Sequence, residues 1–242
     1  MGHERELAVI QQRVVACELC PRLRTYCEHV AREKRRAYRE WSYWGKPVPA
    51  FGDPRAEVVV IGLAPAAHGA NRTGRMFTGD RSGDFLYRAL YQTGFASQPH
   101  SASREDGLKL CGAWITAPVR CAPPGNKPVP GEILTCRQYL EEELAVLPNV
   151  RVVVVLGRIA MNAYLAILKD RGIIRSRAAF PFGHNRRHFI AQGQPVLLCS
   201  YHPSQQNTST GKLTETMLRE VFETARGLLT QVAAGADLPR SQ

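Results

Sequence analysis

Residues 58–80 read VVVIGLAPAAHGANRTGRMFTGD, a buried-strand pattern that runs into a loop of small residues. The first four residues are apolar and β-branched, which favours a strand buried on both faces. Gly62 ends this run, and the glycine, alanine and proline residues after it let backbone amides approach a ligand closely. Because open α/β sheets bind ligands at the carboxyl ends of their strands, we expect a binding site in this loop.

Strands and helices alternate along the rest of the chain. Apolar runs predict strands at 57–61, 114–119, 151–156 and 195–200, and helical periodicity predicts helices at 4–16, 82–92, 131–147, 159–168 and 213–232. The connections between strands are long enough for parallel crossovers. We therefore expect one α/β domain with a mainly parallel sheet covered on both faces. A polar surface loop is expected at 97–106, and an irregular proline-rich segment at 121–130.

The chain is strongly basic. Its 32 Lys and Arg residues against 21 Asp and Glu give a formal net charge of +11, which favours an anionic partner such as nucleic acid or a membrane surface. Residues 22–46 interleave basic and aromatic side chains, a pattern typical of a phosphate-binding surface but also of a solvated helix face. The N-terminus has no apolar signal-peptide core, and the longest aliphatic run, 152–156, is too short to span a bilayer. These features predict a soluble, cytoplasmic protein.

Four of the seven cysteines form a pattern typical of a metal centre. Cys17 and Cys20 make a CxxC pair, and Cys121 and Cys136 follow far downstream. Four thiolates bind either zinc or a [4Fe-4S] cluster, and the uneven spacing favours the cluster because zinc sites more often use two tight pairs. The remaining three are interpreted as small core residues: Cys27, Cys111 and Cys199.

The glycine-rich loop lacks the pattern of a nucleotide-hydrolysing site. Residues 69–75 have neither the lysine nor the hydroxyl that a P-loop places after its second glycine, and they do not match GxGxxG. A second polar loop, YHPSQQN at 201–207, follows the last expected strand. Parallel strands end at the same edge of a sheet, so His202 should share one mouth with Phe77 and Asp80. An isolated histidine is more often structural.

Together, GLAPA at 62–66, TGD at 78–80, the cysteine pattern and YHPSQQN at 201–207 resemble the uracil-DNA glycosylase superfamily. The closest resemblance is to family 5, the type B enzymes with an iron–sulfur cluster, and it covers roughly residues 17–217. It implies a three-layer αβα sandwich around a four-stranded parallel sheet. One domain would span 1–242, with residues 1–50 packed on it as a cluster-binding and basic segment and 236–242 frayed.

The resemblance also implies the activity and the partners. The chain would be a monomeric DNA repair enzyme, associated with the bacterial nucleoid, that flips a deaminated base out of double-stranded DNA and hydrolyses its N-glycosidic bond. An abasic site would remain. A structural [4Fe-4S] cluster would be bound by Cys17, Cys20, Cys121 and Cys136.

The base pocket implied by the resemblance comprises Gly62, Ala64, Ala66, Asn71 and Phe77. Phe77 would stack on the flipped base, and Asn71 and the loop amides would meet its polar edge. Ala64 stands where better-known branches place a carboxylate or asparagine that positions or activates water. Its small side chain leaves room for hypoxanthine and xanthine beside uracil.

Three residues are implied to act on the bond. His202 would donate to the departing base as a neutral imidazole, and Asp80 would position water or stabilise the positive charge on the sugar. Asn126, in the proline-rich segment, matches a family residue with a supporting catalytic role. The second motif departs from uracil-specific relatives, which carry a leucine wedge, because polar residues occupy 205–207 here.

Two other interpretations of the same residues remain open. In the first, the chain is a nonenzymatic iron–sulfur protein that binds DNA or senses redox state. In the second, it is a zinc-stabilised nucleotide-binding enzyme acting on a free small molecule. Abasic-site formation separates the first from a glycosylase, and the colour of the metal centre counts for or against the second.

Overall fold

A computed structural model of the chain describes residues 2–233, so the expectation of a frayed tail at 236–242 lies outside the described residues. Its sheet has the strand order β1-β3-β2-β4-β6-β5. The four central strands are parallel: β3 (Ala113–Thr116), β2 (Val58–Ile61), β4 (Val152–Leu156) and β6 (Val196–Ser200). Short strands β1 (Phe51–Gly52) and β5 (Arg187–His188) pair antiparallel at the two edges. The expected α/β fold with a four-stranded parallel centre is confirmed, with these two edge strands added.

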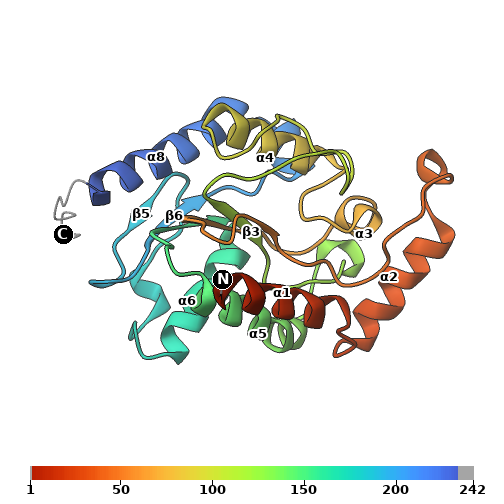
Figure 1. Cartoon of the computed structure of the whole chain (residues 1–242), viewed down its shortest axis with the longest axis horizontal. Coiled ribbons are helices and arrows are strands. Elements are labelled where there is room, and N and C mark those ends of the chain that lie inside the picture. Colours follow the sequence, from red (N-terminus) through yellow and green to blue (C-terminus); the bar gives the residue numbers. More distant parts are fainter. Residues whose placement is uncertain (1, 234–242) are drawn as a thin grey trace.

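Helices cover both faces of the sheet (Figure 1). On one face lie α4 (Arg81–Gln92) and α8 (Glu215–Ala233), and on the other lie α1 (Gly2–Val15), α5 (Pro130–Val146) and α6 (Arg158–Asp170). Alternate residues of β2 point into the two cores, Val60 towards the α4–α8 side and Val59 towards the α5–α6 side. Burial on both faces explains why the central strands are apolar throughout.

The strand expected at 114–119 ends early, at Thr116. Its register places Thr116 opposite Ile61, the last residue of β2. Beyond that pair the amide of Gly62 donates to the carbonyl of Thr116 at 2.8 Å, and the chain turns away into the loop. Residues 117–119 therefore have no neighbouring strand in β2 although they are apolar.

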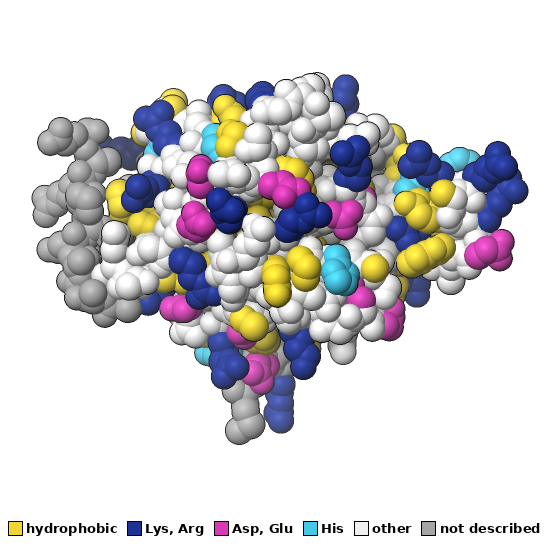
Figure 2. Space-filling model, turned by 90° about the horizontal axis from the view of Figure 1, so that it is seen from above, with side chains coloured by type: hydrophobic (Ala, Val, Ile, Leu, Met, Phe, Trp, Pro, Cys, Tyr) yellow, Lys and Arg dark blue, Asp and Glu magenta, His cyan; other side chains and the backbone are white. Residues whose placement is uncertain are grey.

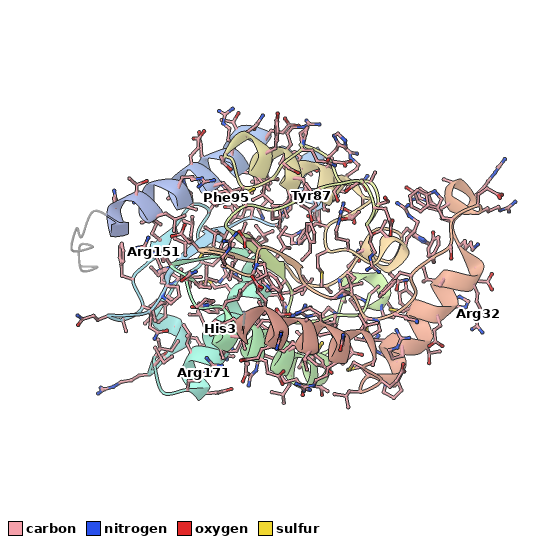
Figure 3. All side chains as sticks on the ribbon, viewed as in Figure 1. His3, Arg32, Tyr87, Phe95, Arg151 and Arg171 are labelled. Atoms are coloured by element: carbon pink, nitrogen blue, oxygen red, sulfur yellow. The ribbon has the colours of Figure 1, made fainter. Side chains whose placement is uncertain are left out.

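The basic segment 22–46 is partly helical. Helix α2 (Pro21–Glu33) buries Leu23, Cys27 and even Arg24, and the 3-10 helix η1 (Arg36–Tyr38) follows it. Together they project from one end of the molecule, where Arg32 points outward from α2 (Figures 1 and 3). Four other short helices lie in loops: α3 (Ala70–Thr73), η2 (Pro124–Asn126), η3 (Arg177–Ala179) and α7 (Gln205–Ser209). Among residues 2–233, none of the helices has the length and apolar character of a membrane span.

Candidate active site

The loop after β2 brings Phe77 onto the end of the sheet. Phe77 has a left-handed φ of 52°. Two glycines make its position possible: a Cβ on Gly62 would lie 2.7 Å from the Phe77 ring, and one on Gly83 would lie 1.8 Å from its carbonyl oxygen. The ring centroid of Phe77 is 6.0 Å from that of His202, with an angle of 34° between the rings. The loops after β2 and β6 thus share one mouth, as expected.

His202 is neutral at physiological pH. Burial lowers the pKa of His202 to about 4. Its backbone is held by Asn207, whose side-chain amide donates to the His202 carbonyl at 2.8 Å, and Ser204 caps the short helix α7 that carries Asn207. A Cβ on Gly157, the residue after β4, would lie 3.4 Å from the His202 Cβ. The imidazole is therefore a neutral donor or acceptor beside Phe77.

Asp80 ends the loop and begins helix α4. Its Oδ1 accepts a hydrogen bond from the Gly83 amide at 2.9 Å, which makes Asp80 the N-cap of α4. A Cβ on Gly69 would lie only 2.0 Å from Oδ2, so the carboxylate packs directly against the Gly69 backbone. Burial raises the pKa of Asp80, while the amides of Gly83 and Ser82 and the charge of Arg72 act in the opposite direction.

The other residues predicted to bind the base, Asn71, Ala66 and Ala64, contact the rest of the protein. Asn71 is 1% exposed, and its Nδ2 donates to the carbonyls of Cys27 and Ala67. Its Oδ1 is buried and has no hydrogen-bond partner among residues 2–233. Ala66 accepts hydrogen bonds from the amides of Gly69 and Asn71. Ala64 packs against the small apolar cluster that contains Cys121. These contacts tie the loop to α2 and to the segment after β3.

Asn126 is exposed and lies in η2 with a left-handed φ of 56°. Among residues 2–233 no side-chain hydrogen bond joins it to Asp80 or His202. The structure therefore brings together Phe77 and His202 and places Asp80 at the end of the same loop, but leaves Asn126 on the surface.

The four predicted ligand cysteines come from separate segments. Cys17 follows α1, Cys20 is the N-cap of α2, Cys121 follows β3 and Cys136 lies on α5. Burial, together with the nearby Cys121 and Cys17, raises the pKa of Cys20. Burial also raises the pKa of Cys136 to about 12, against the effect of Arg120, and Cys121 and Cys17 add to the increase. Cys20 packs against the small apolar cluster that contains Cys121, and Cys17 packs against the one that contains Cys136.

The geometry of these thiols is not that of a closed metal site. Within the described range 2–233, no three His, Cys, Asp or Glu side chains are arranged to hold a metal ion. Their chemistry nevertheless fits one, since all four donors are sulfur and the Arg120 amide donates to Cys136 Sγ at 3.3 Å. Metal binding would displace the thiol protons, and the positive charge of the metal would offset the repulsion between the resulting thiolates.

Comparison with known proteins identifies the family. A family model described as the Uracil DNA glycosylase superfamily matches residues 49–226. The Type-5 uracil-DNA glycosylase of Thermus thermophilus is 51% identical over 217 residues, which cover 90% of this chain and 95% of the relative. The Type-5 uracil-DNA glycosylases of Mycobacterium bovis and Mycobacterium tuberculosis are each 48% identical over 228 residues, 94% of this chain and 83% of each relative.

The chain belongs to the uracil-DNA glycosylase superfamily. The resemblance stated from the sequence motifs is therefore confirmed, and so is the prediction that the chain is an enzyme, a DNA N-glycosylase.

A buried polar network that the sequence did not single out supports the loop between β2 and α4, residues 62–80, which is called the glycosylase loop below. Arg75 is 4% exposed; its Nη2 donates to Asp106 Oδ2 and to Ser101 Oγ, each at 2.6 Å, and its Nε donates to Thr78 Oγ1 at 3.0 Å. The hydroxyl of Tyr87, a buried residue of α4 that is labelled in Figure 3, donates to the Met76 carbonyl at 2.8 Å. These bonds fix the backbone on both sides of Phe77.

The loop at 97–106 was expected on the surface, and its residues are exposed or half-buried except Ser101, for which the expectation was wrong. Ser101 is 2% exposed, and its carbonyl accepts from the Gly79 amide at 3.0 Å. The polar composition of the segment resembled that of a solvated loop because buried polar side chains that are fully hydrogen-bonded have the same residue types. No sequence signal distinguishes the two cases.

Proposed function

We propose that this chain removes uracil from double-stranded DNA by flipping the base out of the duplex and hydrolysing its N-glycosidic bond, which leaves an abasic site. The observation that carries the proposal is the pairing of the Phe77 and His202 rings, 6.0 Å apart, at the ends of β2 and β6. The names of the Type-5 relatives support uracil as the substrate base.

Phe77 and the loop around it would hold the flipped base. The ring supplies a stacking surface, and its backbone is fixed because the neighbouring Met76 and Thr78 are hydrogen-bonded to buried side chains. Among the described residues Asn71 Oδ1 has no hydrogen-bond partner, and an unpaired acceptor of this kind could bind a base N–H. Gly62, Ala64 and Ala66 complete the proposed pocket.

Cleavage separates the base from C1′ of the sugar. The base leaves with the bonding electrons, water supplies a hydroxyl to C1′, and the remaining proton neutralises the base. His202, whose lowered pKa of about 4 keeps it neutral, would donate a hydrogen bond to the developing negative charge on the base. One such donor is worth roughly 3 kcal/mol in the transition state.

Asp80 would act on the sugar side of the bond. Its carboxylate would stabilise the positive charge that develops at C1′ and orient the attacking water. Ala64 supplies no acid or amide for this purpose, so the burden falls on Asp80. Asn126 would assist from η2, where its side chain is exposed.

The small Ala64 side chain supports a wider substrate range than uracil alone, with hypoxanthine and xanthine included. Release of uracil only, from a panel of duplexes that each carry one deaminated base, would contradict this range.

Polar residues of α7 would occupy the space that the flipped base leaves in the duplex. Gln205 and Gln206 are exposed on α7, whereas the Asn207 side chain is hydrogen-bonded to the His202 carbonyl.

A structural [4Fe-4S] cluster bound by Cys17, Cys20, Cys121 and Cys136 is part of the proposal. When bound, it would supply only a cross-link between the N-terminal segment, the segment after β3 and α5, because glycosidic hydrolysis needs no electron. We expect a brown protein that absorbs at about 400 nm and contains about four irons per chain. A colourless protein with one zinc would contradict the cluster.

An abasic-site assay tests the proposed activity. A duplex with one uracil is incubated with the chain, treated with alkali, and examined for strand scission, with a thymine duplex as the control. Scission at the uracil position only is expected, from a monomer in solution. Absence of scission by a protein that still binds the duplex would favour the nonenzymatic DNA-binding interpretation.

A further inference from the structure

Arg72 lies between two aromatic rings of the projecting segment. Its guanidinium carbon is 4.0 Å from the centroid of Tyr38 and 4.1 Å from that of Trp41. The arginine is in α3, inside the glycosylase loop, and is only 3% exposed. The two rings come from η1 and the residues after it, so the projecting segment closes directly over this loop.

The guanidinium also joins the middle of the loop, at His68, to its C-terminal end, at Gly79. Nε donates to the His68 carbonyl at 2.8 Å, and Nη2 donates to the Gly79 carbonyl at 2.7 Å. Gly79 immediately precedes Asp80. Gly79 has a left-handed φ of 79°, which favours glycine, and a Cβ there would lie 2.4 Å from Nη2 and displace the guanidinium. Arg72 thus fixes the peptide from which the Asp80 side chain begins.

Burying the Arg72 guanidinium without an ion-pair partner costs free energy, which suggests that its charge has a function. Among residues 2–233 Arg72 forms no ion pair within 4 Å, and its Nη1 is buried without a hydrogen-bond partner. The aromatic rings and carbonyls around this guanidinium do not neutralise its charge, so the charge acts on nearby ionisable groups. The nearest consequence is at Asp80, where the Arg72 charge opposes the effect of burial on the carboxyl pKa.

We propose that Arg72, clamped between Tyr38 and Trp41, is a positioning residue that fixes Gly79 and thereby the Asp80 carboxylate in the active site. The inference rests on the proposed function, in which Asp80 acts on the sugar. It gives the projecting segment a part in the chemical step, besides any contact with DNA.

A purely structural role would have different consequences. Trp41 is 38% exposed and both rings lie outside the main cores, so their removal should leave the fold intact. Arg226 provides a matched control in a part of the molecule without a proposed role. Its guanidinium lies 3.9 Å from the Phe95 centroid and donates to the carbonyls of Thr93 and Gly94.

The test compares Arg72→Gln with Arg226→Gln in single-turnover uracil release at saturating protein. Arg72→Gln should lower the rate roughly 100-fold, the scale expected when a catalytic group is displaced by about 1 Å, with the Kd for duplex changed less than about threefold. The acid limb of its pH–rate profile should move to higher pH. Arg226→Gln should keep the wild-type rate and profile.

A second pair of variants keeps the test valid if Arg72→Gln does not fold. The double variant Tyr38→Ala with Trp41→Ala retains Arg72 and should lower the rate about tenfold, whereas Tyr38→Phe with Trp41→Phe keeps both rings and should restore it. Hydrogen exchange of residues 76–83, measured without DNA, should rise in the alanine pair only. Equal rates for the alanine pair and wild type, or a loss confined to DNA affinity, would overturn the proposal.

The outcome is separable from that of the proposed function. If the wild-type chain releases no uracil, the proposed function fails, and the exchange measurement still decides whether the rings hold the loop. If the wild type is active and the Arg72 and ring variants match it, only the positioning role fails.

Discussion

The Asp80 carboxylate combines a structural role with a proposed catalytic role. Oδ1 caps α4 through the Gly83 amide, and the same group is proposed to act on the sugar. An N-cap alone would explain an aspartate here, since Asp and Asn are both favoured at that position. The two roles separate chemically because capping needs only an acceptor, whereas stabilising a cation needs a negative charge.

Asp80→Asn should therefore preserve folding and abolish most activity. The amide oxygen still caps α4, so the melting temperature should stay close to that of the wild type. Loss of the charge should lower single-turnover uracil release roughly 100-fold or more, with little change in DNA affinity. Asp80→Ala, which loses the cap as well, should also lower the melting temperature. Full activity in Asp80→Asn would refute the catalytic assignment and leave the cap.

His202 should titrate far below an ordinary histidine. Burial lowers its pKa to about 4, so its ring resonance in a proton NMR titration should move near pH 4 and stay constant from pH 6 to 8. In the unfolded chain the same imidazole binds a proton near pH 6.5. The unfolded state therefore takes up the proton first, and this residue's contribution to stability is lost as the pH falls from about 6.5 towards 4. A midpoint near 6.5 in the folded protein would contradict the neutral-donor role.

At the scale of elements, β3 and α5 are joined by a fully buried ion pair. Arg120, after β3, donates to Glu143 on α5 at 2.7 Å, and the two side chains are 1% and 0% exposed. The Thr116 hydroxyl and the Gln11 amide also donate to Glu143. The Arg120 amide donates to Cys136 on the same helix, so this pair holds the proposed cluster ligands against the sheet.

Removal of the Glu143 carboxylate should be strongly destabilising. Glu143→Ala leaves a buried guanidinium without a counter-charge, and the free energy of unfolding should fall by about 3–5 kcal/mol. Glu142→Ala is the control, because its pair with Arg13 is 33% and 50% exposed and should contribute less than about 1 kcal/mol. Urea unfolding of the cluster-loaded protein measures both. Equal midpoints would show that the buried pair contributes no more than the exposed one.

At the scale of the whole molecule, the formal charge of +11 suits a polyanionic partner. In Figure 2, several Lys and Arg side chains lie beside hydrophobic ones, with a few His and acidic side chains among them, at the end where α2 and η1 project. Exposed Arg35 lies on this projection, and exposed Arg186 lies in the loop before β5. Basic groups at both places would meet the phosphates on either side of a flipped base.

Arg35→Ala and Arg186→Ala should each weaken duplex binding in a salt-dependent way. Each lost phosphate contact should reduce the slope of log K against log salt by about 1, with the rate at saturation unchanged. Arg171→Ala is the control. Arg171 follows the far end of α6, about 20 Å along the helix axis from the end next to His202. A slope unchanged by Arg35→Ala and Arg186→Ala would place the DNA elsewhere.

The sequence alone determined the order of the elements, the parallel sheet and the motif residues at its carboxyl edge. Apolar β-branched runs, helical periodicity and glycine-rich ends act over a few residues, and the rule that parallel strands end together placed Phe77 near His202. Only the tertiary structure decided which side chains hold these residues. Arg72 meets rings 34 and 31 positions earlier in the chain, and Arg75 meets Asp106 31 positions later. Such contacts depend on how distant segments pack, and no local pattern records the partner of a buried polar group.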